Sequence, residues 1–375
     1  MGKVCEKYSG LDKIMKIFNP KDIIPELINI LLKRQIHFNF DLLPFLGKDL
    51  SNEKIYNFFI AGLNQFAQQP KPLGYPVIAQ VEPVNFCNLS CPLCLTTSQT
   101  EARPKKMLSL NAYQTFIHDI GAYLLLLVLW GWGEPLLNPD IIKMIQLAKS
   151  KNILVHLSTN GSVRLSDQKV EGLVNSGLDS LVFAVDGATQ ESYSSYRKGG
   201  NLNLVLSNLK RIVRTKKKYN SHFPIITLRF IIMAHNEKEL PQMKKIAHEA
   251  GVDFFTVRGE AYFNDKNNNF SKPGNTRYQL EHNEKNQASF ICMRPWKRII
   301  MDASEEIIPC EFDYKSKYSF GNIKNNDKVL KIWKGKKASR FRKEFNLGTN
   351  HFYHCKSCIH KIIKNEFCNL ETMTI

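Results

Sequence analysis

The sequence predicts an α/β protein built around a mainly parallel sheet. Between residues 76 and 260, apolar runs of strand length alternate with amphipathic stretches of helical period. Strands that alternate with helices in this way form parallel sheets with right-handed crossovers. Gly, Cys and acidic residues follow the apolar strand bodies. Functional groups of such folds collect at the C-terminal strand ends, so we expect the site there.

Six apolar runs have the length of strands. They are VIAQVE (77–82), LLLLVLW (124–130), ILVHLST (153–159), SLVFAV (180–185), ITLRFIIM (226–233) and DFFTVR (253–258). Helices are expected at 109–123, 138–151, 166–177, 203–218 and 239–251, with Ser109, Asn138 and Ser166 as N-caps and Gly177 and Gly251 as C-caps. Six such units form either a doubly wound sheet or an incomplete barrel.

Residues 1–75 are expected to form a helical N-terminal extension. The stretch KDIIPELINILLKRQI (21–36) has helical apolar spacing, and SNEKIYNFFIAGLNQFA (51–67) begins with a capping residue, Ser51. The Pro- and Gly-rich QPKPLGYP (69–76) is typical of a linker. We therefore place the strand–helix core at 76–265 and a small cysteine-containing domain at 285–370.

The composition is that of a soluble globular protein. With 375 residues, 43% of them hydrophobic and 23% charged, the chain can bury a large core without disulfides. It has neither the ~20 consecutive apolar residues of a membrane span nor the pattern of a signal peptide. We therefore expect it in the cytoplasm, where nine cysteines indicate metal ligands rather than disulfides.

The net charge of +18 is concentrated in KRIVRTKKK (210–218) and KNNDKVLKIWKGKKASRFRK (324–343). Such runs can attract phosphates, nucleic acid or anionic lipid headgroups. Because nothing else in them resembles a nucleic-acid motif, we interpret both as solvated lysine-rich faces. Nucleic acid is therefore not an expected partner.

Three cysteines follow the first predicted strand in FCNLSCPLCLTT (86–97). Cys87, Cys91 and Cys94 have the spacing C-x3-C-x2-C within one tight loop. A structural zinc site needs four protein ligands, and a catalytic zinc usually adds His or a carboxylate. A [4Fe–4S] cluster bound through three cysteines leaves one iron open to an outside ligand. The loop therefore favours such a cluster.

CNLSCPLC, together with motifs at later strand ends, resembles the radical S-adenosylmethionine (radical SAM) superfamily over residues 77–260. The resemblance implies a partial (βα)6 TIM barrel and SAM as a cofactor. GWGEPL (131–136), STNG (158–161), VDG (185–187) and YRKGG (196–200) are similar to the SAM-binding segments of the family, which implies cofactor contacts by Gly131, Gly133, Glu134, Pro135, Ser158, Asn160, Asp186 and Arg197. Arg197 would pair with the methionine carboxylate, whereas Glu134 is also a candidate for orienting its loop.

Two positions depart from this family pattern. Trp132 stands where the motif normally has its first glycine, so close backbone approach would rest on Gly131 and Gly133. Leu93 stands where many members have an aromatic residue against the adenine. We expect a weaker stacking contact but an intact cluster site.

A second cysteine set follows residue 290. CMRPWKRIIMDASEEIIPC (292–310) predicts a two-stranded hairpin with a cysteine at each end, and HCKSC (354–358) supplies two more. Four thiolates suit either a structural zinc or a second [4Fe–4S] cluster. The segment resembles the SPASM/twitch extension of radical SAM enzymes, which implies an auxiliary [4Fe–4S] cluster on Cys292, Cys310, Cys355 and Cys358. Cys5 and Cys368 stay outside both sets.

The resemblance implies an oxidoreductase-type radical SAM enzyme. It would cleave SAM reductively to a 5′-deoxyadenosyl radical that abstracts hydrogen from the substrate, with flavodoxin or ferredoxin as electron donor. The auxiliary cluster suggests a two-electron oxidation of a small molecule such as a sugar or aminocyclitol. Tyr196, Arg229, His235 and Glu260 lie near strand ends, but the sequence assigns the catalytic base to none of them.

Two other functions stay open. A SPASM-type maturase of ribosomally made peptides would use the same clusters, although such enzymes usually carry more cysteines. A basic nucleic-acid-binding protein held together by zinc would use the second cysteine set only for structure.

Overall fold

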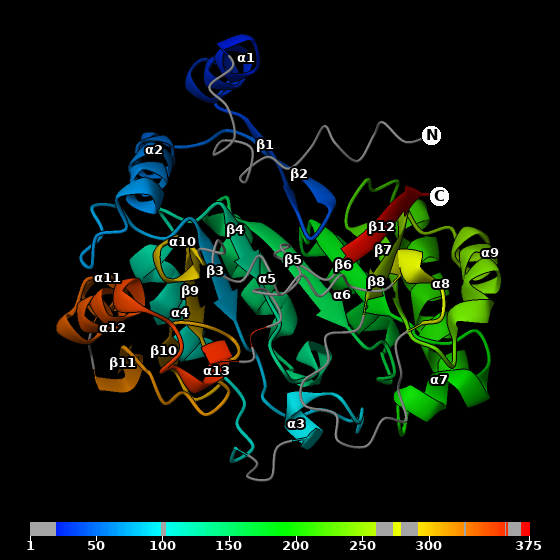
Figure 1. Ribbon diagram of the computed structural model, residues 1–375. Helices are drawn as coiled ribbons and strands as arrows, with labels where there is room; N and C mark the ends of the chain where they lie inside the picture. Colours follow the sequence, from blue (N-terminus) through cyan, green and yellow to red (C-terminus); the bar gives the residue numbers. More distant parts are fainter. Residues whose placement is uncertain are drawn as a thin grey trace.

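The computed structural model describes residues 20–98, 103–259, 273–278, 292–325, 328–356, 358 and 369–375. Its centre is a ten-stranded sheet in the order β11-β10-β9-β3-β4-β5-β6-β7-β8-β12 (Figure 1). The strands are β3 (Ile78–Val81), β4 (Leu126–Val128), β5 (Leu154–Thr159), β6 (Ser180–Ala184), β7 (Ile225–Ile232), β8 (Phe254–Gly259), β9 (Arg298–Met301), β10 (Glu306–Ile308), β11 (Gly321–Asn322) and β12 (Asn369–Thr374).

Strands β3 to β8 correspond to the six predicted strands, and adjacent strands within this set of six are parallel. They lie side by side in chain order, without the reversal of a doubly wound sheet. Successive right-handed crossovers in one direction put all their helices on the same face. The fold is therefore the partial barrel, one of the two arrangements that the strand–helix pattern allows.

The predicted core helices are present, with small shifts at their ends. Helices in the described residues are α1 (Pro20–Leu31), α2 (Asn52–Ala67), α3 (Leu95–Ser98), α4 (Leu110–Ile120), α5 (Ile141–Ser150), α6 (Asp167–Asn175), α7 (Gln190–Tyr196), α8 (Leu202–Lys218), α9 (Leu240–Ala250), α10 (Arg294–Lys297), α11 (Val329–Trp333), α12 (Lys336–Leu347) and α13 (Tyr353–Lys356). Ser109 and Ser166 cap α4 and α6 through their hydroxyls, and Gly251 ends α9 with φ +71°.

Two of the predicted caps are wrong. Asp140, not Asn138, is the N-cap of α5. The side chain of Asn138 is used instead to join loops, since its amide donates to the carbonyls of Pro83 (3.0 Å) and Leu108 (3.2 Å). Gly177 follows Ser176, the C-cap of α6, and adopts φ +82°.

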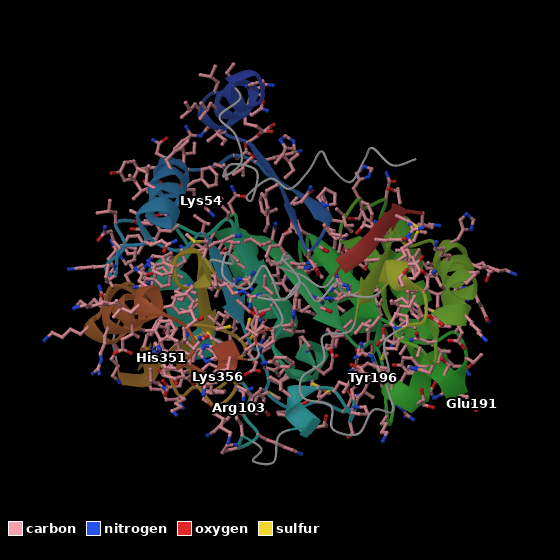
Figure 2. The ribbon with its side chains drawn as sticks, in the orientation of Figure 1. Lys54, Arg103, Glu191, Tyr196, His351 and Lys356 are labelled. Atoms are coloured by element: carbon pink, nitrogen blue, oxygen red, sulfur yellow. The ribbon has the colours of Figure 1, made fainter. Side chains whose placement is uncertain are left out.

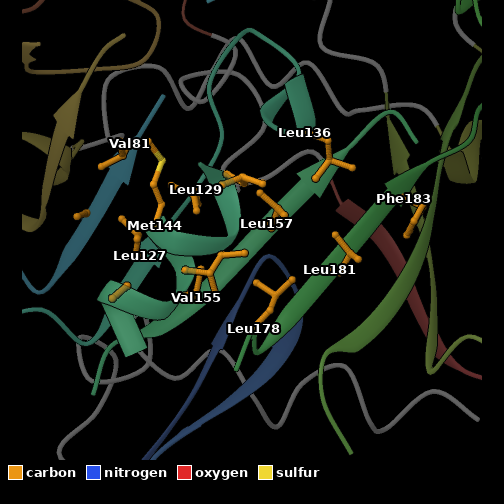
Figure 3. Packing of buried hydrophobic residues seen from close by; sticks show 14 of the residues in the cluster. Val81, Leu127, Leu129, Leu136, Met144, Val155, Leu157, Leu178, Leu181 and Phe183 are labelled. Carbon is orange, nitrogen blue, oxygen red and sulfur yellow. The ribbon is translucent and has the colours of Figure 1, made fainter. Parts of the chain in front are cut away.

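The main core lies between the helices and one face of the sheet. Alternate strand residues point into it, including Val81, Leu127, Leu129, Val155, Leu157, Leu181 and Phe183, which Figure 3 shows with Met144 of α5. Period-2 alternation directs the intervening residues to the opposite, concave face. That face holds both the N-terminal segment and the site.

The N-terminal extension was expected to be helical, but the structure shows that it also contains strands. Between α1 and α2 the chain forms an antiparallel hairpin of β1 (Ile36–Phe40) and β2 (Leu43–Gly47). Both strands alternate buried and more exposed positions, and the apolar side packs on the concave face of the sheet. The period-2 alternation of these two short strands was overlooked because the stretch before them, residues 21–36, has helical apolar spacing.

The C-terminal cysteine region is continuous with the main sheet. The predicted hairpin between Cys292 and Cys310 forms as β9 and β10, and β9 pairs in parallel with β3. At the other edge β12 pairs antiparallel with β8. The first strand of the core is therefore hydrogen-bonded directly to the second cysteine region (Figure 1).

In the part of the chain that the structure describes, none of the helices has the length and apolarity required to cross a lipid bilayer.

Candidate cofactor and cluster sites

A cavity of about 330 Å³ opens at the C-terminal ends of the parallel strands. Most of the predicted site residues line it: Cys87, Cys91, Cys94, Gly131, Gly133, Glu134, Ser158, Asn160 and Arg197. Pro135 and Asp186 lie outside the lining, and both are buried behind it. Strand ends far apart in sequence thus meet at one place, as the parallel sheet requires.

The three-cysteine loop is held against the second and third strand ends. The Cys87 sulfur accepts hydrogen bonds from the Leu89 backbone N–H and the Asn160 amide, each at 3.4 Å. Burial raises the pKa of Cys87 to about 12. Because iron–sulfur clusters bind thiolates, loading a cluster here would release protons from these thiols.

The two glycines of GWGEPL allow very close backbone packing. A Cβ on Gly133 would lie 2.2 Å from the Val84 carbonyl oxygen, and one on Gly131 would lie 2.6 Å from the Cγ of Glu82. Trp132 between them is tolerated because its side chain points toward the C-terminal region, where its indole N–H donates to the Glu311 carbonyl at 2.8 Å. Close backbone approach therefore rests on Gly131 and Gly133, as the sequence indicates.

Glu134 is buried and ties neighbouring loops together. Its carboxylate accepts hydrogen bonds from the Leu136 N–H (3.0 Å), the Thr159 hydroxyl (2.7 Å) and the Asn160 N–H (2.8 Å). Burial raises the pKa of Glu134, and these three donors oppose that rise. Its carboxylate orients the loop that carries Asn160 as well as its own loop.

Arg197 forms a buried ion pair with Asp186. The Asp186 carboxylate accepts from the Arg197 Nε and from the Ile231 backbone N–H at 2.7 Å. The other end of the guanidinium reaches the cavity, with Nη1 3.8 Å from the Cys91 sulfur. Asp186 thus positions Arg197 from behind, while the guanidinium faces the cysteine loop.

The candidate acid–base residues are spread out. Tyr196, at the end of α7 (Figure 2), and Arg229 both line the cavity. His235 is absent from the lining, and burial lowers the pKa of its imidazole. Glu260 lies outside the described residues, as do Cys5 and Cys368.

The second cysteine set forms its own pocket. Cys292, Cys310, Cys355 and Cys358 line it together, beside Arg294 and His354. Burial raises the pKa of Cys310 to about 12, opposed by Arg294, whose Nη1 lies 3.8 Å from the sulfur. The four cysteines from two distant segments converge as the sequence predicts.

The second pocket also contains a buried imidazole, that of His354. His354 is 7% exposed, and neither of its ring nitrogens has a hydrogen-bond partner in the described part of the chain. Such a buried imidazole would gain an acceptor from the sulfur atoms of a bound cluster.

Several lining residues were missed by the sequence analysis. They are Phe40, Gln80, Trp130, Thr159, Arg258, Arg298, Glu311 and Phe312. Gln80 and Arg258 are polar residues within otherwise apolar strands, and both lie on the concave face. Their polarity at these strand positions could have identified them as site residues from the sequence. Phe40 had no such signal, because the hairpin that carries it was not predicted.

Comparison with known families matches two consecutive parts of the chain. The model of the radical SAM superfamily matches residues 81–247. The model of SPASM, an iron–sulfur cluster-binding domain, matches residues 292–359. The two matches contain the three-cysteine loop and the second cysteine set, respectively.

Individual relatives are distant. Pre-heme d1 synthase of Dinoroseobacter shibae is 28% identical over 185 residues, which are 49% of this chain and 43% of that protein. PqqA peptide cyclase of Gluconobacter oxydans is 25% identical over 188 residues, 50% of each chain. The chain therefore spans about half the length of these curated relatives.

Solved structures share the fold. Streptococcus suis SuiB bound to S-adenosylmethionine superposes with a TM-score of 0.58 at 14% identity, over 88% of this chain and 80% of that chain. SuiB has also been solved with its precursor peptide SuiA. At this identity the likeness establishes the fold and nothing finer.

Proposed function

The chain is a radical SAM protein with a C-terminal SPASM domain, families that imply SAM and [4Fe–4S] clusters, and from this premise we propose that it is a SAM-cleaving oxidoreductase. The observation that carries the proposal is the cavity at the strand ends, where Cys87, Cys91 and Cys94 lie beside Arg197. A [4Fe–4S] cluster and SAM bound there would supply a 5′-deoxyadenosyl radical that removes hydrogen from the substrate.

The chain's own residues bind and orient in this scheme. Arg197, fixed by Asp186, offers its free edge to the methionine carboxylate. The Asn160 backbone N–H donates to Glu134, and its side-chain amide donates to Asn88 of the cysteine loop. The backbone at 131–133, where Gly131 and Gly133 allow close approach, lines the same cavity. Glu311 and Phe312 add lining to the cavity from the C-terminal domain.

The proposed role of the second site is electron transfer. Cys292, Cys310, Cys355 and Cys358 would occupy all four protein-ligand positions of an auxiliary [4Fe–4S] cluster, which leaves no iron open for substrate. A cluster held there would supply an acceptor for the electron left on the substrate after hydrogen abstraction, and the substrate would release a proton to solvent or to a base. The net reaction would then be a two-electron oxidation of a small molecule, with methionine and 5′-deoxyadenosine as the products from SAM.

Peptide modification is a second candidate. It is supported by the similarity to PqqA peptide cyclase and by the fold shared with SuiB, which was solved with the precursor peptide SuiA. The small-molecule proposal rests on the single auxiliary cysteine set. Adding peptides encoded near the gene and recording mass losses of two hydrogens would distinguish the two candidates.

The test is iron content and SAM cleavage after anaerobic purification. Wild-type protein is expected to bind about eight irons, given two cubanes of four, and to form 5′-deoxyadenosine with dithionite and SAM. A Cys355→Ala/Cys358→Ala variant is expected to lose about half its iron and still cleave SAM, because cleavage uses the other cluster.

Two variants complete this experiment. A Cys87→Ala/Cys91→Ala variant should form no 5′-deoxyadenosine, while Cys5→Ala, which belongs to neither set, should match wild type. A colourless, zinc-loaded wild-type protein that forms no 5′-deoxyadenosine would refute the proposed function and support the zinc-held alternative.

A further inference from the structure

Four arginines line the cavity at the strand ends, each from a different element. They are Arg197 after α7, Arg229 of β7, Arg258 of β8 and Arg298 of β9. A cavity lined by this many guanidinium groups attracts anions unless each cation is neutralised by a protein carboxylate. Which of the four are neutralised therefore decides what the cavity can bind.

Three of these arginines have carboxylate partners. Arg197 pairs with Asp186, and Arg298 lies 3.3 Å from the Glu311 carboxylate and 3.3 Å from the Gln80 side-chain oxygen. Arg229 pairs with Asp41, which stands at the tip of the β1–β2 hairpin. These pairs hold the cations in place and use much of their capacity to bind an outside anion.

Arg258 differs from the other three. Its guanidinium has no hydrogen bond or ion pair with any residue in the described ranges, although it is half-buried. Phe255 and Val257 of the same strand point into the helical core, so alternation puts Arg258 on the concave face. Its neighbour across the sheet is Ile231, which packs beside the three-cysteine loop.

The charges around Arg258 add to this imbalance. Its positive charge reaches Asp41, Arg229 and His156, the titratable groups on the cavity floor. Burial lowers the pKa of His156, so the imidazole stays neutral there. Asp41 acts on both the Arg229 and the Arg258 guanidinium but bonds only to Arg229, and Asp186, which also acts on Arg229, is paired with Arg197. Neither of these two carboxylates is therefore paired with Arg258.

We propose that Arg258 is an anion-binding residue, and that the substrate carries a carboxylate or phosphate group that pairs with its guanidinium. A planar guanidinium binds either group through two parallel hydrogen bonds. Phe40 and Trp130 line the same cavity and provide apolar contact for the rest of the molecule. The inference rests on the proposed function, and within it an anionic substrate is favoured over a cationic aminocyclitol.

The experiment measures anion binding to the SAM-loaded holoenzyme by anaerobic calorimetry at constant ionic strength. The probes are inorganic phosphate and acetate, and SAM is present throughout so that its own carboxylate already occupies Arg197. Wild type is expected to bind at least one probe saturably. Arg258→Met should weaken that binding at least about tenfold, and Arg258→Lys, which keeps the charge without the planar fork, should fall between them.

Arg214→Met is the matched control, because Arg214 is exposed on α8 away from the cavity, and it should bind the probes as wild type does. Binding of phosphate alone, or of acetate alone, would identify the anionic group. The inference would be overturned if wild type bound neither probe, or if Arg258→Met bound the probes as tightly as wild type does. It would also be overturned if Arg258→Met lost as much affinity for SAM as for the anion. Formation of 5′-deoxyadenosine by wild type tests the proposed function separately.

Discussion

At the scale of single residues, Glu134 shows how one buried carboxylate organises the cavity. It accepts from two backbone N–H groups and one hydroxyl, and these donors belong to two different strand ends. Its position in GWGEPL indicated a role at the site, but the sequence left open whether it contacts the cofactor or orients its loop. The hydrogen bonds assign it an orienting role.

We therefore expect Glu134→Gln to loosen the site. The NH2 group of the new amide would face one of the three groups that now donate to the carboxylate. That buried donor would lose its acceptor, which should lower the free energy of unfolding by about 1–3 kcal/mol. Thermal unfolding and the dissociation constant for SAM would measure the effect. Glu191→Gln, the same change at an exposed position of α7 (Figure 2), should leave both nearly unchanged; an equally small effect at Glu134 would contradict the prediction.

At the scale of elements, the β1–β2 hairpin forms the floor of the cavity. Phe40 lines it, and Asp41 fixes Arg229 from below. The two turn residues, Asp41 and Leu42, have φ values of +56° and +58°, which L-residues other than Asn and Asp rarely adopt. The hairpin keeps this turn because the Asp41 carboxylate is paired inside the protein.

Leu42→Gly should relieve the strain at the second turn position. It produces the Asp-Gly pair that two-residue hairpins prefer, and we expect about 0.5–1 kcal/mol of stabilisation after the entropy cost of glycine. Melting temperatures of Leu42→Gly and Leu42→Ala would be compared, since alanine removes the exposed side chain without relieving the backbone. A lower melting temperature for the glycine variant would show that the turn is not strained.

At the scale of the whole molecule, the two cysteine sites are parts of one sheet. The β3–β9 pairing and the contact between Trp132 and Glu311 fix the cluster domain against the strand ends. Arg342 of α12 adds a third connection: it is fully buried and donates to the carbonyls of Pro295 (2.8 Å), Trp333 (2.9 Å) and Pro70 (3.3 Å). The basic run 324–343 is therefore not wholly the solvated face that the sequence analysis expected.

Arg342→Met should destabilise the protein by about 1–3 kcal/mol, because two buried carbonyls, those of Pro295 and Trp333, and the partly buried carbonyl of Pro70 would lose a donor. The measurement is thermal unfolding of the cluster-loaded protein, with iron content checked first. Arg340→Met is the control on the same helix, since Arg340 is exposed and its pair with Glu344 contributes little. Equal melting temperatures for the two variants would show that Arg342 does not hold the domains together.

The sequence by itself determined the strand–helix core, the two cysteine sets and most of the residues around the first cavity. Periodicity and cysteine spacing are local properties of the chain, so the strands and Cys87 could be predicted from them, whereas Asn160 and Arg197 were implied by the resemblance of their motifs to the radical SAM superfamily. Only the tertiary structure decided that the N-terminal hairpin supplies the floor, that Asp186 stands behind Arg197, and that Arg258 faces the cavity without a described partner. These facts depend on which distant segments meet on the concave face, and strand pairing and side-chain packing settle that.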